Sequence, residues 1–193
     1  MSYKEAFALA EQVSAELTPL VAKLKCVGSL RRRRKRIGDI EFLAMPHFDV
    51  DLLGHQTPII DPLRRAMTEM GTWIKGGERM MQVTDLFGNA GARLELYLVH
   101  PPASWGSLLA IRTGPAELGR YVMTVCREHG VKHKDGYARR LAGGELVPTE
   151  TEEEFFALAK VDCLPPMLRD AQAKNLWEQR ERNRPSIPAR RRW

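Results

Sequence analysis

The sequence has few of the features that mark membrane, secreted or cysteine-rich proteins. Its longest apolar stretches fall far short of the roughly 20 residues that a membrane-spanning helix needs. The N-terminus carries acidic residues where a signal peptide has an apolar core. Only three cysteines occur among 193 residues, and no two form a Cys-x-x-Cys pair. A disulfide framework and a cysteine-rich zinc site are therefore disfavoured, and we expect a cytoplasmic protein with reduced thiols and no membrane partner.

The net charge of +6 comes from two short basic segments rather than from the whole chain. Residues 31–36 are six consecutive cations, and residues 180–193 hold six more against one acid. The rest of the chain is net acidic. Concentrated positive charge on an acidic body favours a polyanionic partner, either nucleic acid or nucleotide phosphate, bound at defined places. A solubilising or nuclear-targeting patch is the alternative, and composition alone does not separate the two.

Hydrophobic periodicity predicts an α+β protein of two lobes, residues 1–108 and 109–180, followed by a basic, flexible tail at 181–193. In the first lobe we expect helices after Ser2 and over 58–71. Four strands are also predicted there, at 24–27, 37–45, 80–87 and 92–99, the last two joined as a hairpin.

The second lobe is predicted to begin with a helix over 115–129, followed by a two-stranded segment within 137–147. A short acidic helix follows, with Thr149 and Glu152 spaced as a capping box. One more polar helix is expected after Pro166. This lobe is smaller and more polar than the first.

The chemistry is concentrated between residues 27 and 43, VGSLRRRRKRIGDIEFL. Gly28-Ser29 follows a strand and precedes a segment that can start a helix, so exposed N–H groups and a hydroxyl there suit a phosphate. The arginines that follow supply guanidinium groups for phosphate oxygens. Asp39 and Glu41 stand at i and i+2 of a strand and therefore share a face. Their carboxylates favour Mg²⁺ or Mn²⁺ between them.

A third carboxylate, Glu95, lies between two apolar residues on another predicted strand. Three converging acids are the minimum for a two-metal site. In this order and spacing, the chain resembles the family X DNA polymerases, the polymerase-beta-like branch of the nucleotidyltransferases. The resemblance covers about residues 20–170. The segments that carry it are Gly28-Ser29-Leu30-Arg31-Arg32, Gly38-Asp39-Ile40-Glu41, Arg93-Leu94-Glu95-Leu96, Ile111-Arg112-Thr113-Gly114, the acidic-Phe segment 149–156 and Pro-Pro-Met-Leu-Arg at 165–169.

The resemblance implies a nucleotidyltransferase palm, with a mixed β-sheet and helices on one face, and a small C-terminal α/β lobe that closes on the nucleotide. It implies that Asp39, Glu41 and Glu95 are catalytic and bind two Mg²⁺ or Mn²⁺ ions. The positions that match its nucleotide site are Gly28, Ser29, Arg32, Gly38, Arg112, Thr113 and Gly114. We expect DNA contacts from Arg34, Lys35, Arg36, Arg120, Lys132 and Lys134.

The chain departs from the family at several of these positions. Two family aspartates are glutamates here, Glu41 and Glu95, and Asp85 on the partner strand is a substitute for the third ligand. The aromatic pair beneath the nucleotide sugar is replaced by Ile111-Arg112. The chain has no room for the N-terminal domain that larger relatives use as a lyase, so we expect no lyase activity and a minimal form like those of viruses and phages.

These observations predict a monomeric enzyme that adds a deoxynucleotide to the 3′-hydroxyl of a primer–template or gapped duplex, with low fidelity, in DNA repair. One alternative keeps the chemistry and changes the acceptor, giving a template-independent transferase acting on RNA, a protein or a small molecule. The other is a non-catalytic DNA-binding protein with this fold. The two enzymatic hypotheses require a divalent cation and a nucleoside triphosphate, and the polymerase and the binding protein require DNA. These requirements distinguish the three hypotheses.

Overall fold

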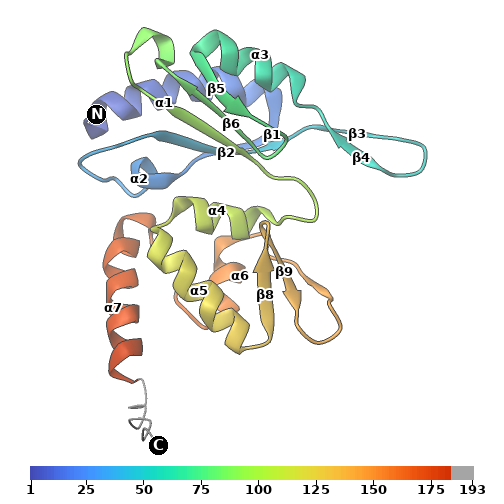
Figure 1. Ribbon diagram of the computed structural model, residues 1–193, viewed down its shortest axis with the longest axis vertical. Helices are drawn as coiled ribbons and strands as arrows, with labels where there is room; N and C mark the ends of the chain where they lie inside the picture. The colour runs from blue at the N-terminus through green and yellow to red at the C-terminus, as the bar shows by residue number, and fades with distance from the viewer. Residues whose placement is uncertain (184–193) are drawn as a thin grey trace, which may run out of the picture.

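A computed structural model describes residues 1–183 of the chain. The protein has two lobes, one above the other in Figure 1. The protein is of the α+β class with a mixed sheet. Most of the predicted basic tail lies outside the described residues. Within the described part, no helix is both long and apolar enough to cross a membrane.

The first lobe contains a five-stranded sheet in the order β1-β2-β7-β6-β5. Its strands are β1 (Val21–Cys26), β2 (Ile40–Pro46), β5 (Thr72–Gly76), β6 (Met80–Thr84) and β7 (Leu94–Leu98). Only β2 and β7 run parallel to each other; every other neighbouring pair is antiparallel. The two strands that carry the predicted acids are therefore adjacent in the middle of the sheet.

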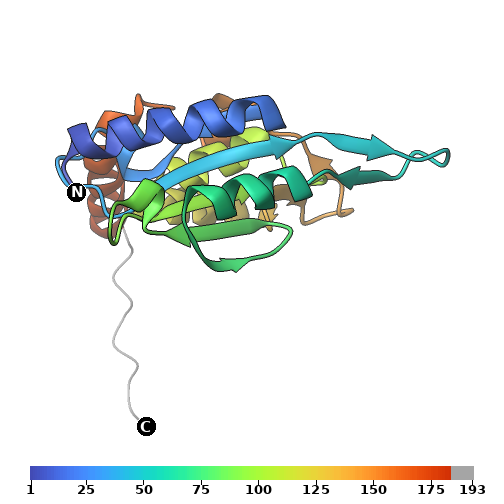
Figure 2. The ribbon, with the colours of Figure 1, turned by 90° about the horizontal axis from the view of Figure 1, so that it is seen from above.

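Two helices cover one face of this sheet, α1 (Tyr3–Leu17) and α3 (Asp61–Met70) (Figure 2). Helix α1 begins with a capping box between Ser2 and Glu5, and it buries Ala6, Ala10 and Val13 at helical spacing. The prediction of this helix is confirmed. The opposite face packs against α4 (Trp105–Thr113) through a small apolar cluster, so the sheet is covered by helices on both faces rather than on one.

Three strands of the first lobe were not predicted from the sequence, whereas a short helix is present at Gly28-Ser29, where the sequence indicates that one can start. Strand β5 forms the sheet edge, and α2 (Gly28–Arg31) follows β1. Strands β3 (Phe48–Val50) and β4 (Gln56–Pro58) pair only with each other and form a ribbon that projects from the end of β2 (Figures 1 and 2). Single-turn 3₁₀ helices lie at Thr18–Leu20, Leu86–Gly88 and Pro166–Leu168.

The second lobe is built around a core of its own, which includes Leu118, Val122, Phe155 and Phe156. Its elements are α4, α5 (Ala116–Glu128), β8 (Val131–Lys134), β9 (Tyr137–Arg140), β10 (Leu146–Val147), α6 (Glu152–Ala157) and α7 (Arg169–Arg182). The three strands form one antiparallel sheet instead of the predicted pair.

The predicted capping box of α6 is wrong by two residues. Thr151 and Glu154 form it, because the helix begins at Glu152. Thr149 is buried instead, with its hydroxyl 2.5 Å from that of Ser107. This shift places Glu152 on the first turn with its side chain in the interior, facing the first lobe.

Candidate active site

The acids Glu41 and Glu95 lie side by side on the two parallel strands. They are direct partners in the β2–β7 register, and both are half-buried. Their neighbours Ile40, Leu94 and Leu96 are fully buried, so the alternation of the strands turns the two acids to the face opposite α1 and α3. Asp39 precedes β2 rather than standing inside it, because the strand begins one residue later.

The surroundings of Glu41 raise its pKa to about 7. Burial is the largest cause and the charge of Glu95 the second; Asp39 acts in the same direction, whereas Arg32 and Arg112 oppose it. Both of the other predicted acids therefore act on Glu41. A hard divalent cation would relieve this repulsion, and carboxylate oxygens are the donors it prefers.

Glycine is required at position 28 by the carboxylate of Glu41. Gly28 has φ +65°, and a Cβ there would lie 1.6 Å from Oε2 of Glu41. The absence of a side chain lets this carboxylate lie directly against the turn at the start of α2. Gly38, by contrast, has no atom within 4 Å of a built Cβ, so sterics do not require glycine there.

We expect Gly28→Ala to lower both stability and any activity of the site. The new methyl group would displace Glu41, and a positive φ at a non-glycine residue costs about 1–3 kcal/mol. Thermal unfolding measures the loss. Gly38→Ala is the matched control and should change the midpoint little; equal destabilisation by both substitutions would contradict the assigned role of Gly28.

Two side chains that the sequence analysis did not consider hold Glu95 in place. Gln82 Nε2 donates to Oε1 of Glu95 at 2.9 Å, and the Tyr97 hydroxyl donates to Oε2. Gln82 is the register partner of Glu95 on β6, and Tyr97 stands two residues along β7. Burial and this hydrogen bond to Glu95 raise the pKa of Tyr97, so its hydroxyl stays a donor.

The three predicted acids do not converge into a complete metal-binding group in this arrangement. Within residues 1–183, no three His, Cys, Asp or Glu side chains lie close enough together to hold a metal. Asp39 lies 3.8 Å from Arg93 Nε, and both oxygens of Glu95 accept the hydrogen bonds described above. The donor chemistry fits Mg²⁺ or Mn²⁺, and Glu95 can ligate through the lone pairs that its two hydrogen bonds leave free, in the orientation that these bonds fix.

Asp85, the substitute third ligand, serves a different purpose. It has φ +55°, and its Oδ1 accepts a hydrogen bond from the Gly91 N–H at 2.8 Å. It therefore stabilises the turn between β6 and β7. It is absent from the charges that shift the pKa of Glu41, whereas Glu95 is among them.

The first two arginines of the basic run connect the lobes. Arg31 forms a bidentate ion pair with Glu152 at 2.7 and 2.8 Å and donates to the Thr113 hydroxyl. Arg32 donates to the Thr113 carbonyl and lies 3.3 Å from Asp170. A Cβ at Gly114 would lie 2.8 Å from the Arg32 guanidinium, so this glycine admits the contact.

Glu152 is also bound from its own lobe. Arg169, with only 1% of its surface exposed, lies 2.6 Å from Oε1 of Glu152. Burial acts to raise the pKa of Glu152, but the hydrogen bonds from Arg31 and Arg169 outweigh it and hold that pKa below its usual value. Charged groups from both lobes thus meet at one buried carboxylate.

A cavity of about 360 Å³ lies between the end of β7 and the second lobe. Its wall includes Tyr97, Arg112, His133 and Lys134. The Arg112 guanidinium stacks 3.7 Å above the ring centre of Tyr97, the residue that also reaches Glu95. The cavity is therefore connected to the acidic site through that stacked pair.

The predicted DNA contacts fall into separate groups. Arg34, Lys35 and Arg36 lie on the exposed loop after α2, where Arg34 is 3.5 Å from Asp170. Arg120 and Lys132 border a hollow of about 500 Å³ on the second lobe, together with Arg127, which the sequence analysis did not single out. None of the residues lining that hollow is acidic. Lys134 borders the interlobe cavity instead. Ser29, which is predicted to contact phosphate rather than DNA, is half-buried at the start of α2.

A scan against protein-family models and a search of the curated proteins found no match to this chain.

Proposed function

We propose that the chain is a metal-dependent nucleotidyltransferase that extends a DNA 3′ end. In this proposal the first lobe is a palm of the family X type and the second lobe closes on the nucleotide. The single observation that carries it is the pairing of Glu41 with Glu95 on adjacent parallel strands, directly over the Gly28 turn. Phosphate-binding groups and metal-binding acids then face one another, as nucleotidyl transfer requires.

The residues have distinct tasks in this reaction. Asp39, Glu41 and Glu95 would hold two divalent cations, which supply charge neutralisation at the triphosphate and at the attacking oxygen. Gln82 and Tyr97 would hold the Glu95 carboxylate in position for cation binding through their hydrogen bonds. Because the pKa of Glu41 is about 7, this carboxylate is partly protonated near neutrality, and cation binding displaces that proton.

The nucleotide would lie between the lobes. Ser29 and the α2 backbone would meet its phosphates, and Arg32 would join them by exchanging its contact with Asp170. Arg112, Thr113 and Gly114 line the second lobe's side of this space. The hollow bordered by Arg120, Arg127 and Lys132 is suited to a DNA strand because its lining includes three cations and no acid.

Primer extension on a one-nucleotide gap tests the proposal. Asp39→Asn and Glu41→Gln should each lower the rate at least about 100-fold, because each removes a charge that stabilises the transition state. Asp85→Asn is the matched control: it also removes a carboxylate charge, but at the β6–β7 turn, and should leave extension nearly unchanged. Equal activity in wild type, Asp39→Asn and Glu41→Gln would overturn the proposal.

The same assay separates the alternatives. Nucleotide addition that persists after the template strand is omitted indicates a template-independent transferase. Binding of gapped DNA without any nucleotide addition, with either Mg²⁺ or Mn²⁺, indicates a non-catalytic DNA-binding protein. The two hydrogen bonds that restrain Glu95 are the observation that favours this last outcome.

A further inference from the structure

The β3–β4 ribbon ends in an unusual apolar tip. Leu52 is fully exposed and Leu53 is 82% exposed, and Val50 beside them is 62% exposed. The ribbon pairs with no other strand of the described chain. An isolated two-stranded ribbon is marginal in water, and adjacent exposed leucines at its end mark a site of contact with another molecule.

The turn that carries these leucines is well ordered by hydrogen bonds. Asp51 Oδ1 accepts from the N–H groups of Leu53 and His55, both at 2.8 Å, and its other oxygen lies 2.9 Å from Nδ1 of His55. Gly54 completes the turn with φ +82°. The backbone therefore presents the two leucines in a fixed arrangement, which reduces the entropy lost when they bind.

The tip is acidic as well as apolar. Residues 46–60 contain Asp49 and Asp51 and no lysine or arginine. Hydrogen bonds from His55 hold the pKa of Asp51 below its usual value, so it is charged at neutral pH. Negative charge makes the tip a poor fit for DNA and a good fit for an apolar protein surface with a basic rim.

The first lobe has such a surface at its other end. An apolar groove of about 330 Å³ lies between α1 and the β1–α2 segment, within the range of sites that take small apolar groups. Phe7, Leu24, Leu30 and Phe42 line it, and Phe7 is 45% exposed. On its rim the exposed cations Lys25 and Arg33 outnumber the acid Glu11.

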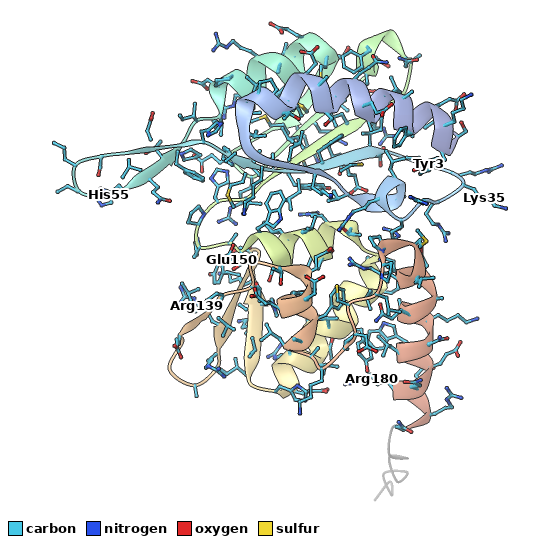
Figure 3. All side chains as sticks on the ribbon, turned by 180° about the vertical axis from the view of Figure 1, so that it is seen from behind. Tyr3, Lys35, His55, Arg139, Glu150 and Arg180 are labelled. Atoms are coloured by element: carbon cyan, nitrogen blue, oxygen red, sulfur yellow. The ribbon has the colours of Figure 1, made fainter. Side chains whose placement is uncertain are left out.

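We propose that the tip of the β3–β4 ribbon of one molecule inserts Leu52 and Leu53 into the α1–β1 groove of a second copy. The apolar surfaces match, and the aspartates of the tip would face Lys25 and Arg33 on the rim. Tyr3, at the groove, and His55, at the tip, lie at opposite ends of the lobe (Figure 3). The contact is therefore head-to-tail, and it joins copies into open chains, or into rings where the rotation between copies closes.

Sedimentation velocity of the full chain over a range of concentrations tests this inference. Wild type should increase in average mass with concentration. Leu52→Glu/Leu53→Glu and, separately, Phe7→Glu should each remain monomeric, because each loses one of the two surfaces. All three altered residues are exposed, so circular dichroism should show unchanged folding. Leu141→Glu, at a 54% exposed leucine of the second lobe, is the matched control and should assemble like wild type.

Mixing the two monomeric variants gives the decisive result. The tip variant keeps an intact groove and the groove variant keeps an intact tip, so an equimolar mixture should form a heterodimer of twice the monomer mass and nothing larger. A mixture that stays monomeric would overturn the proposal, as would a wild type that is monomeric at every concentration. Primer extension does not enter this test, so its outcome is independent of the proposed enzymatic function.

Discussion

Replacing Glu152 with alanine should lower the free energy of unfolding by about 3–5 kcal/mol, the cost of leaving a buried charge without its partner. Arg169 is almost fully buried, and its ion pair with Glu152 at 2.6 Å would be lost. Arg31 would lose its bidentate partner across the lobes in the same variant. Urea unfolding followed by circular dichroism measures the effect.

Two further variants define the source of this loss. Asp170→Ala removes a partly exposed acid that pairs with Arg32 and Arg34 at 3.3 and 3.5 Å, and it should cost no more than about 1 kcal/mol. Glu152→Leu/Arg169→Met removes the buried Glu152–Arg169 pair and should recover the part of the loss that comes from Arg169, since apolar side chains replace a buried pair at little cost. Arg31 still lacks its partner in this variant. A Glu152→Ala variant no less stable than Asp170→Ala would contradict the importance of this buried carboxylate.

Much of the candidate site could be predicted because its residues lie in local patterns. Glu41 is predicted because it stands two residues after Asp39 and would share a face with it in a strand. Glu95 is predicted because it lies between two apolar residues of another strand. Their direct pairing required the knowledge that β2 and β7 are adjacent and parallel, which is a property of the sheet topology and not of either segment. Gln82 could have been found from its polar side chain between apolar residues of the strand MMQVT.

Other features could not be predicted because they depend on contacts between distant segments. Glu152 lies 121 residues after Arg31, and a glutamate at a helix start is ordinarily interpreted as a capping residue. The β3–β4 ribbon was missed because each strand has only three residues, fewer than a periodic pattern needs. The acids could therefore be predicted from the sequence, whereas the ion pairs that join the lobes could not.

Two groups with large and opposite pKa shifts should contribute to the pH dependence of stability between pH 4 and 7. The first is His133, whose two ring nitrogens are buried without a hydrogen-bond partner among the described residues and whose ring packs against Phe155. Burial lowers its pKa from 6.5 to about 4. Between these values the unfolded chain binds the proton more readily, so this group makes the protein less stable as the pH falls, by about 3 kcal/mol in total.

The second group is Glu41, whose pKa is raised from 4.5 to about 7, chiefly by burial and then by Glu95. Here the folded chain binds the proton more readily, so stability decreases as the pH rises from 4.5 to 7, by about 3 kcal/mol. The two windows overlap between pH 4.5 and 6.5. In wild type the two slopes should largely cancel there.

Single substitutions should show separately how His133 and Glu41 each make stability depend on pH. Glu41→Gln leaves His133 alone, so the urea midpoint should rise steadily with pH across the overlap; His133→Leu leaves Glu41 alone, so the midpoint should fall. Exposed acids and histidines titrate equally in all three proteins and cancel when the profiles are compared. Added Mg²⁺ should flatten the falling profile of His133→Leu above pH 6.5, because a bound cation opposes protonation of Glu41. Parallel profiles for both variants would contradict the burial of His133 and of Glu41. They would also contradict the pairing of Glu41 with Glu95, on which the proposed chemistry depends.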